Sequence, residues 1–192
     1  MPRIDSKKFY LSAIDKHGLS PQGVNWISQE TQDLRFKILL ELLPTNINTL
    51  VDAGCGFADF YMYLQNTQHC IKKYIGIDSL AAMCTIAVQE TSQEIIQADI
   101  TKDALPQADY YVCSGAMNIL NPFEAHLFIR NCFKASSKAF IFNTLYGDKQ
   151  SNTYNYMSMA QIQAIAKDLH VKRLEIKDNY MKNDITVAFF HV

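Results

Sequence analysis

The stretch that decides the fold is DAGCGFAD, residues 52–59, which directly follows the strand-like run INTLV at residues 47–51. The chain has only seven glycines, and two of them, Gly54 and Gly56, stand one residue apart where this run ends. Glycine adopts positive φ angles and has no Cβ, so another molecule can approach its backbone closely. The stretch predicts a tight strand-to-helix turn at a place where ligands reach α/β sheets.

Beyond this turn, strand-like runs alternate with helix-like stretches, which is typical of a parallel sheet covered by helices on both faces. The run ADYYVCSG at residues 108–115 is the most apolar and aromatic of these, as in a central strand buried on both sides. Asn121 followed by Pro122 fits the start of a helix. We expect strands at residues 48–53, 73–78, 94–98, 108–114 and 138–145, and helices at 57–66, 80–90, 122–135 and 158–169.

The two ends of the chain depart from this alternation. Residues 171–180 and 184–192 read as two alternating strands joined by a short turn, so the sheet is expected to finish in an antiparallel hairpin. Residues 6–16 and 28–43 have helical spacing, with Ser28 as a cap, and a loop rich in glycine and proline lies between them. We expect residues 1–45 to form a helical lid over a domain spanning 46–192.

Composition limits the class of protein. The 192 residues suit one domain, and the net charge of −1, with no basic run longer than a pair, does not favour a nucleic-acid partner. No apolar leader and no run of 18 apolar residues is visible, which argues against a membrane span. The five cysteines are dispersed without a C-x-x-C pair, so we expect reduced thiols, no metal site and a cytoplasmic location.

The glycine turn fits two kinds of cofactor site, and the residue at position 59 separates them. A dinucleotide-binding turn, G-x-G-x-x-G/A, would place its third small residue at Asp59, where a carboxylate would repel a pyrophosphate. A nicotinamide-dependent reductase is therefore disfavoured. The spacing is instead acidic-x-G-x-G-x-small, with Asp52 first and Ala58 last.

This spacing resembles the first motif of the class I S-adenosylmethionine-dependent methyltransferases, h-h-D/E-x-G-x-G-x-G, from which Ala58 departs at the third glycine. The resemblance implies a cofactor with an ammonium and a sulfonium, to which the carboxylate of Asp52 is attractive. It extends over residues 46–192. It also implies an α/β, Rossmann-like fold with a seven-stranded, mostly parallel sheet, the C-terminal hairpin supplying the last two strands.

Two further aspartates end successive predicted strands. In the resembling family the position of Asp78 accepts from the ribose hydroxyls, and that of Asp99 accepts from the adenine amine beside the backbone N–H of Ile100. A helix cap at Asp78 and a turn at Asp99 are the alternative interpretations. The predicted cofactor-contact residues are Asp52, Gly54, Cys55, Gly56, Asp78, Ser79, Met83, Asp99, Ile100, Ser114 and Gly115.

The function that follows is transfer of a methyl group, by in-line displacement, from S-adenosylmethionine to an O or N atom of a small-molecule acceptor, leaving S-adenosylhomocysteine. Alignment matters more than a base in such a reaction, so the family has no universal catalytic residue. His17 is the candidate base. Candidate acceptor contacts are Tyr10, Trp26, Arg35, Asn143 and Tyr146, with Asp33 or Glu41 as alternative partners for Arg35. The alternative function is a non-catalytic sensor or assembly protein that binds S-adenosylmethionine or S-adenosylhomocysteine.

Overall fold

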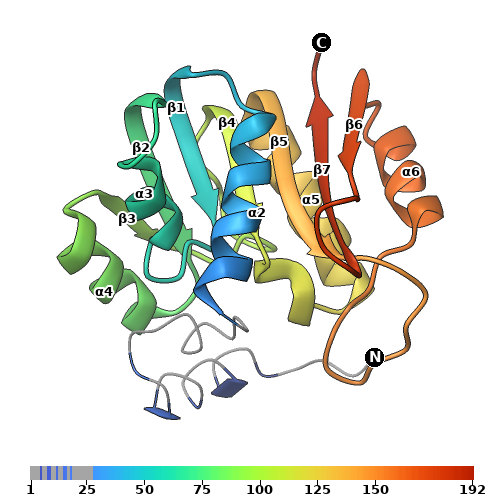
Figure 1. Cartoon of the computed structure of the whole chain (residues 1–192), viewed down its shortest axis with the longest axis horizontal. Helices are drawn as coiled ribbons and strands as arrows, with labels where there is room; N and C mark the ends of the chain where they lie inside the picture. Colours follow the sequence, from blue (N-terminus) through green and yellow to red (C-terminus); the bar gives the residue numbers. More distant parts are fainter. Residues whose placement is uncertain (1–4, 6–7, 10–11, 13–14, 17, 19–27) are drawn as a thin grey trace.

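One seven-stranded sheet organises the molecule in the computed structural model, which describes residues 5, 8–9, 12, 15–16, 18 and 28–192 (Figure 1). The strand order is β3-β2-β1-β4-β5-β7-β6, and β7 is antiparallel to both of its neighbours. The strands are β1 (Asn46–Ala53), β2 (Cys70–Asp78), β3 (Glu94–Gln97), β4 (Ala108–Ser114), β5 (Ser136–Leu145), β6 (Arg173–Lys177) and β7 (Asp184–Phe190). The predicted α/β class and the antiparallel C-terminal hairpin are confirmed.

The order of the strands reverses between β1 and β4, which lie side by side in the middle of the sheet. From β1 the chain moves outward through β2 and β3, and from β4 it moves to the other edge. Asp52, near the end of β1, lies between Gly76 of β2 and Val112 of β4 in the strand register. Such a switch point leaves a crevice at the carboxyl ends of the strands.

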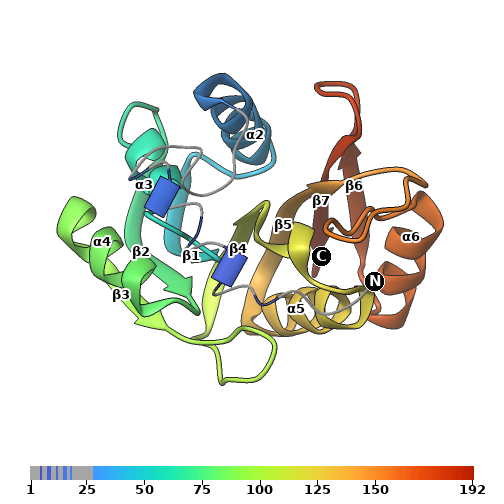
Figure 2. The same ribbon diagram turned by 90° about the horizontal axis from the view of Figure 1, so that it is seen from below.

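Helices cover both faces of the sheet (Figure 2). The apolar side chains of α2 and α3 pack on one face, in a cluster with Leu50, Val112 and Ile141. Those of α5 and α6 pack on the other face, in a cluster with Val51, Tyr111 and Phe140. The helices are α2 (Gln29–Glu41), α3 (Asp59–Leu64), α4 (Ala81–Thr91), α5 (Pro122–Ala135) and α6 (Met159–Asp168), with a 3-10 helix, η2 (Ala116–Ile119), after β4.

Local sequence signals set where several of these helices begin. Ser28 caps α2, Asn121 caps α5 with Pro122 in the first turn, and Ser158 caps α6. In each case the cap and the third helical residue exchange hydrogen bonds between side chain and backbone, as in a capping box. The caps predicted at Ser28 and Asn121 are confirmed.

The main differences from the sequence-based expectations lie in element length. The helix expected at 57–66 shortens to α3, because Ala58 has a left-handed backbone (φ 64°) and the turn extends to it. Strands β2 and β5 start earlier than expected, at Cys70 and Ser136. The helix expected at 6–16 includes residues outside those described, and η2 was not predicted.

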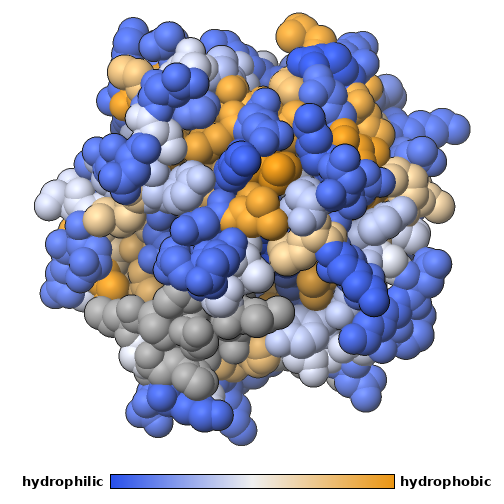
Figure 3. Space-filling view, viewed as in Figure 1, coloured by the Kyte–Doolittle hydropathy of each residue, from blue (hydrophilic) through white to orange (hydrophobic). Residues whose placement is uncertain are grey.

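The surface is mixed in character. On the face shown in Figure 3, apolar side chains reach the surface in small areas among polar ones. Among the described residues, no helix is both long enough and apolar enough to cross a membrane.

Candidate functional site

A cleft with a cavity volume of about 160 Å³ lies at the carboxyl ends of β1, β2 and β4, against the inner face of α2. All the residues predicted to contact a cofactor line this one cleft: Asp52, Gly54, Cys55, Gly56, Asp78, Ser79, Met83, Asp99, Ile100, Ser114 and Gly115. The topology brings them together because successive parallel strands end at the same edge of the sheet. These predicted contact residues come from four separate stretches of the chain.

The glycine turn forms the floor of the cleft. The backbone N–H groups of Gly54 and Cys55 both donate to the carbonyl oxygen of Ile77, at 2.7 and 3.0 Å, which ties the end of β1 to β2. Gly54 has φ 77°, and a Cβ built there would lie 2.3 Å from the Cβ of Ala116. Gly54 is therefore required for the close approach of η2 to the turn, as well as for its backbone conformation.

Ala58 occupies the position of the family's third glycine and is fully buried in the left-handed region. A non-glycine residue there costs about 1–2 kcal/mol. The replacement of the family's third glycine by Ala58 therefore introduces backbone strain. The chain nevertheless makes the turn and starts α3 at Asp59.

Asp52 is the most deeply buried acidic group of the cleft. Its side chain belongs to a residue that is 3% exposed, and Oδ2 accepts a hydrogen bond from the Tyr74 hydroxyl at 2.8 Å. Burial, with a smaller effect from the nearby carboxylates of Asp78 and Asp59, raises the pKa of Asp52 to about 7 against the effect of that bond. A positive ligand would relieve this unfavourable charge.

Asp78 joins the first two turns of the cleft. Its Oδ2 accepts from the backbone N–H of Gly56 at 3.1 Å, and its Oδ1 accepts from that of Leu80 at 2.9 Å. Burial raises the pKa of Asp78, although these backbone hydrogen bonds act in the opposite direction. A carboxylate has about four lone-pair sites, so it can accept further bonds from hydroxyl groups of a ligand.

Gln32 and Asp59 are cleft residues that the sequence reasoning did not assign. Gln32 is 2% exposed, and its Nε2 donates to Asp59 Oδ2 at 2.8 Å, so its Oε1 faces away from that carboxylate. This oxygen is buried and has no hydrogen-bond partner among the described residues. Burial raises the pKa of Asp59. A signal was present, because Gln32 and Arg35 share the inner face of α2 with Phe36 and Leu39 at helical spacing.

Asp99 lines the cleft and also organises its own turn. Its Oδ1 accepts from the backbone N–H and the hydroxyl of Thr101 at 3.0 and 2.6 Å, and its Oδ2 accepts from Lys102 Nζ at 2.5 Å. Burial works against the charge, but these partners outweigh it and lower the pKa of Asp99. These contacts within the chain are the ones expected if Asp99 stabilises a turn.

The predicted acceptor contacts have different surroundings. Arg35 lines the cleft and forms a buried ion pair with Asp184 of β7, and neither Asp33 nor Glu41 is its partner in that pair. Asn143 is fully buried behind Ser114, to which it is hydrogen bonded. In the described part of the chain, neither Asn143 nor Tyr146, which forms a β-bridge with Met157, is among the residues lining the cleft. Tyr10, His17 and Trp26 lie outside the described residues.

The charges of the cleft indicate the ligand that it suits. Asp52, Asp59 and Asp78 line it together, and burial raises the pKa of each. Three partly desolvated carboxylates at close range would repel an anion such as a pyrophosphate and attract a cation. These three carboxylates therefore fit a cofactor with positive groups.

Comparison with known proteins supports the fold. No protein-family model and no curated protein matches the sequence. The chain resembles magnesium protoporphyrin IX methyltransferase of Synechocystis with bound S-adenosylhomocysteine, with a TM-score of 0.67 and 14% identity, covering 85% of this chain and 83% of that one. It also resembles human N-acetylserotonin methyltransferase in complex with S-adenosylmethionine, with a TM-score of 0.73 and 12% identity. This match covers 97% of this chain and 60% of that one.

A third similar structure is the complex between the Haloferax volcanii Trm112 methyltransferase activator and a methyltransferase. It matches with a TM-score of 0.69 and 14% identity over 99% of both chains. These structures share the architecture of the sheet with this chain at low sequence identity. The chain therefore has the fold of the class I S-adenosylmethionine-dependent methyltransferases.

Proposed function

We propose that the protein is an S-adenosylmethionine-dependent methyltransferase. The observation that carries the proposal is the meeting of Asp52, Asp59 and Asp78, with raised pKa values, at the glycine turn of this fold. When bound, S-adenosylmethionine supplies a methyl group activated by its sulfonium. The carboxylates of the chain would attract the positive end of this molecule and hold it in the cleft.

The proposed roles of the cleft residues follow the order of the strands. Asp52 supplies negative charge beneath the glycine turn, and Asp78 accepts from the ribose hydroxyls with its remaining lone pairs. Asp99 and the backbone of Ile100 face the adenine, while Met83 packs against it. Ser79 and Cys55 complete the wall, and Gly115 leaves room for the reacting groups.

We propose that residues 1–45 act as the lid of a domain spanning residues 46–192. The supporting observation is that Gln32, Arg35 and Phe36 of α2 line the cleft together with Phe9. A lid that excludes water strengthens the electrostatic interactions inside a site and holds the reacting groups together. In this proposal His17 of the lid is the candidate base, and Tyr10 and Trp26 are candidate acceptor contacts.

The proposed acceptor is a small molecule that receives the methyl group on an O or N atom. A methyl transfer of this kind breaks the bond from the sulfonium sulfur to carbon, forms the bond from carbon to the acceptor, and releases the acceptor's proton. Arg35 at the cleft wall is suited to an acceptor or cofactor carboxylate, because a guanidinium presents five N–H donors. S-adenosylhomocysteine is the expected product.

Calorimetry with S-adenosylmethionine, S-adenosylhomocysteine and NADH tests the proposal. We expect the first two to bind and NADH not to bind. Mass spectrometry after incubation of the protein with methyl-labelled donor and a small-metabolite extract then tests for transfer. Tight donor binding with no labelled product would support the sensor instead, and absence of donor binding would refute both.

A matched pair of glycine variants tests whether the ligand binds at the glycine turn. Gly56 and Gly147 both have positive φ, 57° and 124°, but among the described residues Gly147 is not one of those lining the cleft. Replacement by valine strains the backbone in both cases. We expect Gly56→Val to abolish donor binding and Gly147→Val to retain it. Equal donor affinity in the two variants would remove the glycine turn from the site.

A further inference from the structure

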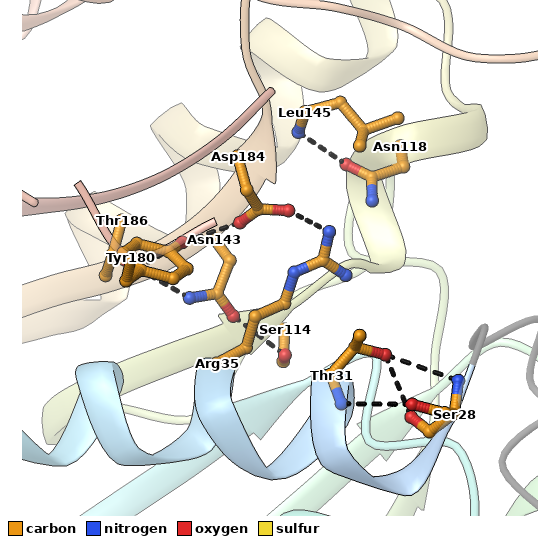
Figure 4. A network of polar contacts seen from close by, with 10 residues as sticks. All are labelled: Ser28, Thr31, Arg35, Ser114, Asn118, Asn143, Leu145, Tyr180, Asp184 and Thr186. Atoms are coloured by element: carbon orange, nitrogen blue, oxygen red, sulfur yellow. Dashed lines mark hydrogen bonds and ion pairs between the residues drawn. The ribbon is translucent and has the colours of Figure 1, made fainter. Parts of the chain in front are cut away.

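A continuous chain of hydrogen bonds runs from Ser114, at the end of β4, to Arg35 on α2 (Figure 4). Both end residues line the cleft. Of the four inner members, Asn143, Thr186 and Asp184 are at most 1% exposed, and Tyr180 is half-buried. Buried polar groups are costly to maintain, and well-packed apolar residues often serve stability as well or better. A chain of this kind that joins two walls of the cleft therefore points to a role there.

The direction of the hydrogen bonds is fixed from the Arg35 end. Arg35 Nη2 forms an ion pair with Asp184 Oδ2, and an ionised carboxylate can only accept hydrogen bonds. The Tyr180 hydroxyl donates to Asp184 Oδ1 at 2.6 Å. Burial raises the pKa of Tyr180, so this hydroxyl keeps its proton at neutral pH. Since Tyr180 has donated its only proton, Thr186 Oγ1, 2.8 Å away, must donate to the tyrosine oxygen.

The same reasoning continues to the cleft. Asn143 Nδ2 donates to Thr186 Oγ1 at 2.8 Å, which sets the orientation of the carboxamide. Its Oδ1 therefore faces Ser114, whose Oγ lies 2.7 Å away. A carbonyl oxygen has no proton, so Ser114 must donate its single proton to Asn143. Toward a ligand, the Ser114 hydroxyl can offer only its lone pairs.

We propose that Ser114 is a specificity-determining acceptor, and that Asn143 and Thr186 are positioning residues that fix its polarity. The ligand group recognised there is an N–H or O–H donor. A carboxylate, ketone or ether at the same place would meet a lone pair and be disfavoured. The donor is either the ammonium of the methionyl end of S-adenosylmethionine or an N–H or O–H of the methyl acceptor. This inference rests on the proposed function, and it adds that the Ser114 side of the site accepts hydrogen bonds and does not donate them.

Calorimetry with two ligands and four proteins tests it. The ligands are S-adenosylhomocysteine and an analogue in which hydrogen replaces the amino group. The proteins are the wild type, Ser114→Ala, Thr186→Val and Thr186→Ser. Loss of a hydrogen bond to a charged donor weakens binding by about tenfold or more. We expect Ser114→Ala to lose this factor for S-adenosylhomocysteine and to bind the analogue like the wild type.

The Thr186 variants separate positioning from folding. Valine removes the acceptor of Asn143 Nδ2, so the carboxamide is free to turn and present N–H groups to Ser114. We expect Thr186→Val to show the same selective loss, and Thr186→Ser, which retains the hydroxyl, to restore binding. Thermal unfolding of each protein is measured in parallel. An equal loss for both ligands would show a merely structural role and overturn the inference.

The source of the donor follows from the same variants. If Ser114→Ala binds both ligands normally but transfers less labelled methyl to the small-metabolite extract, the donor belongs to the methyl acceptor. Unchanged binding and unchanged transfer in Ser114→Ala and Thr186→Val would overturn the inference. A wild-type protein that binds both ligands equally, together with unchanged methyl transfer by Ser114→Ala, contradicts this inference alone. A wild type that fails to bind S-adenosylhomocysteine contradicts the proposed function itself.

Discussion

Replacing Asp52 by asparagine is expected to stabilise the protein and, at the same time, to weaken its binding of S-adenosylmethionine. The residue is 3% exposed, and its carboxylate accepts a hydrogen bond from Tyr74. Asparagine has nearly the same shape and keeps an oxygen for this bond, so the substitution removes mainly the buried charge. The two effects have one cause, because the buried charge that attracts the ligand destabilises the folded chain when no ligand is bound.

The pKa of Asp52 gives the size of the stability effect. Burial raises this pKa from 3.8 to about 7, and the difference corresponds to about 4 kcal/mol when the group is ionised in the folded state. The folded protein binds the proton more tightly than the unfolded chain does. The stabilisation that comes from this tighter proton binding is therefore fully present below pH 4. It is lost as the pH rises to about 7, where the cost of the buried charge takes its place. We expect Asp52→Asn to gain up to ~4 kcal/mol over the wild type at pH 8 and little at pH 4.

Urea unfolding between pH 4 and pH 9 measures the free energy of unfolding of both proteins. Asp178→Asn is the matched control, because Asp178 is exposed in the connection between β6 and β7. We expect the control to follow the wild type at every pH. If Asp52→Asn is no more stable than the wild type at pH 8, or if its gain is the same at pH 4, the assignment of a strained buried charge is wrong.

Calorimetry at pH 8 measures the second effect. Opposite charges near a protein surface attract by about 4 kcal/mol at 4 Å, and this attraction is partly screened in an open cleft. We expect Asp52→Asn to bind S-adenosylmethionine at least tenfold more weakly. Between pH 5 and 7 the wild type should bind more tightly as the pH rises. A smaller fraction of Asp52 is then protonated, so fewer molecules have to lose this proton when the ligand binds. Unchanged affinity in the variant would contradict the role of this charge.

Three other substitutions test separate parts of the structure. Gly54→Ala places a methyl group against Ala116 at a positive φ, so we expect a loss of about 2–3 kcal/mol in urea unfolding; a stable variant would contradict the tight packing of η2 on the turn. Asp78→Ala removes the acceptor of two backbone N–H groups, and calorimetry should show donor binding weakened by about tenfold or more, whereas an unchanged affinity would contradict its ribose role. Asp184→Asn leaves Arg35 buried beside a neutral group, and a loss of about 3–5 kcal/mol in urea unfolding is expected; a loss below 1 kcal/mol would show that the pair contributes little.

The sequence was most informative where short-range signals act. The alternation of strands and helices, the caps at Ser28 and Asn121 and the terminal hairpin all depend on residues close together in the chain, and the structure confirms them. The acidic strand ends Asp52 and Asp78 could be placed at one cleft because parallel strands end at the same edge. Local pattern and topology together were sufficient for this part of the site.

Contacts between distant residues were not predictable in the same way. The pairing of Arg35 with Asp184 joins residues 149 positions apart, and nearer acidic residues on α2 offered plausible partners. Asn143 could be placed near the end of a strand, but its depth behind Ser114 depends on the packing of β7. The helical spacing of Gln32 with Phe36 and Leu39 indicated the inner face of α2, but what a polar side chain contacts there depends on neighbours such as Asp59 that come later in the chain.

The reversed direction of β7 has a practical consequence for handling the protein. Because β7 runs antiparallel to β5, it carries the chain away from the ligand cleft, and Val192 lies at the opposite end of the sheet (Figure 1). A fluorophore or a biotin group attached after Val192 would therefore stand clear of the site. Immobilisation through that end should leave the entrance facing solution, which suits ligand titrations on a sensor surface.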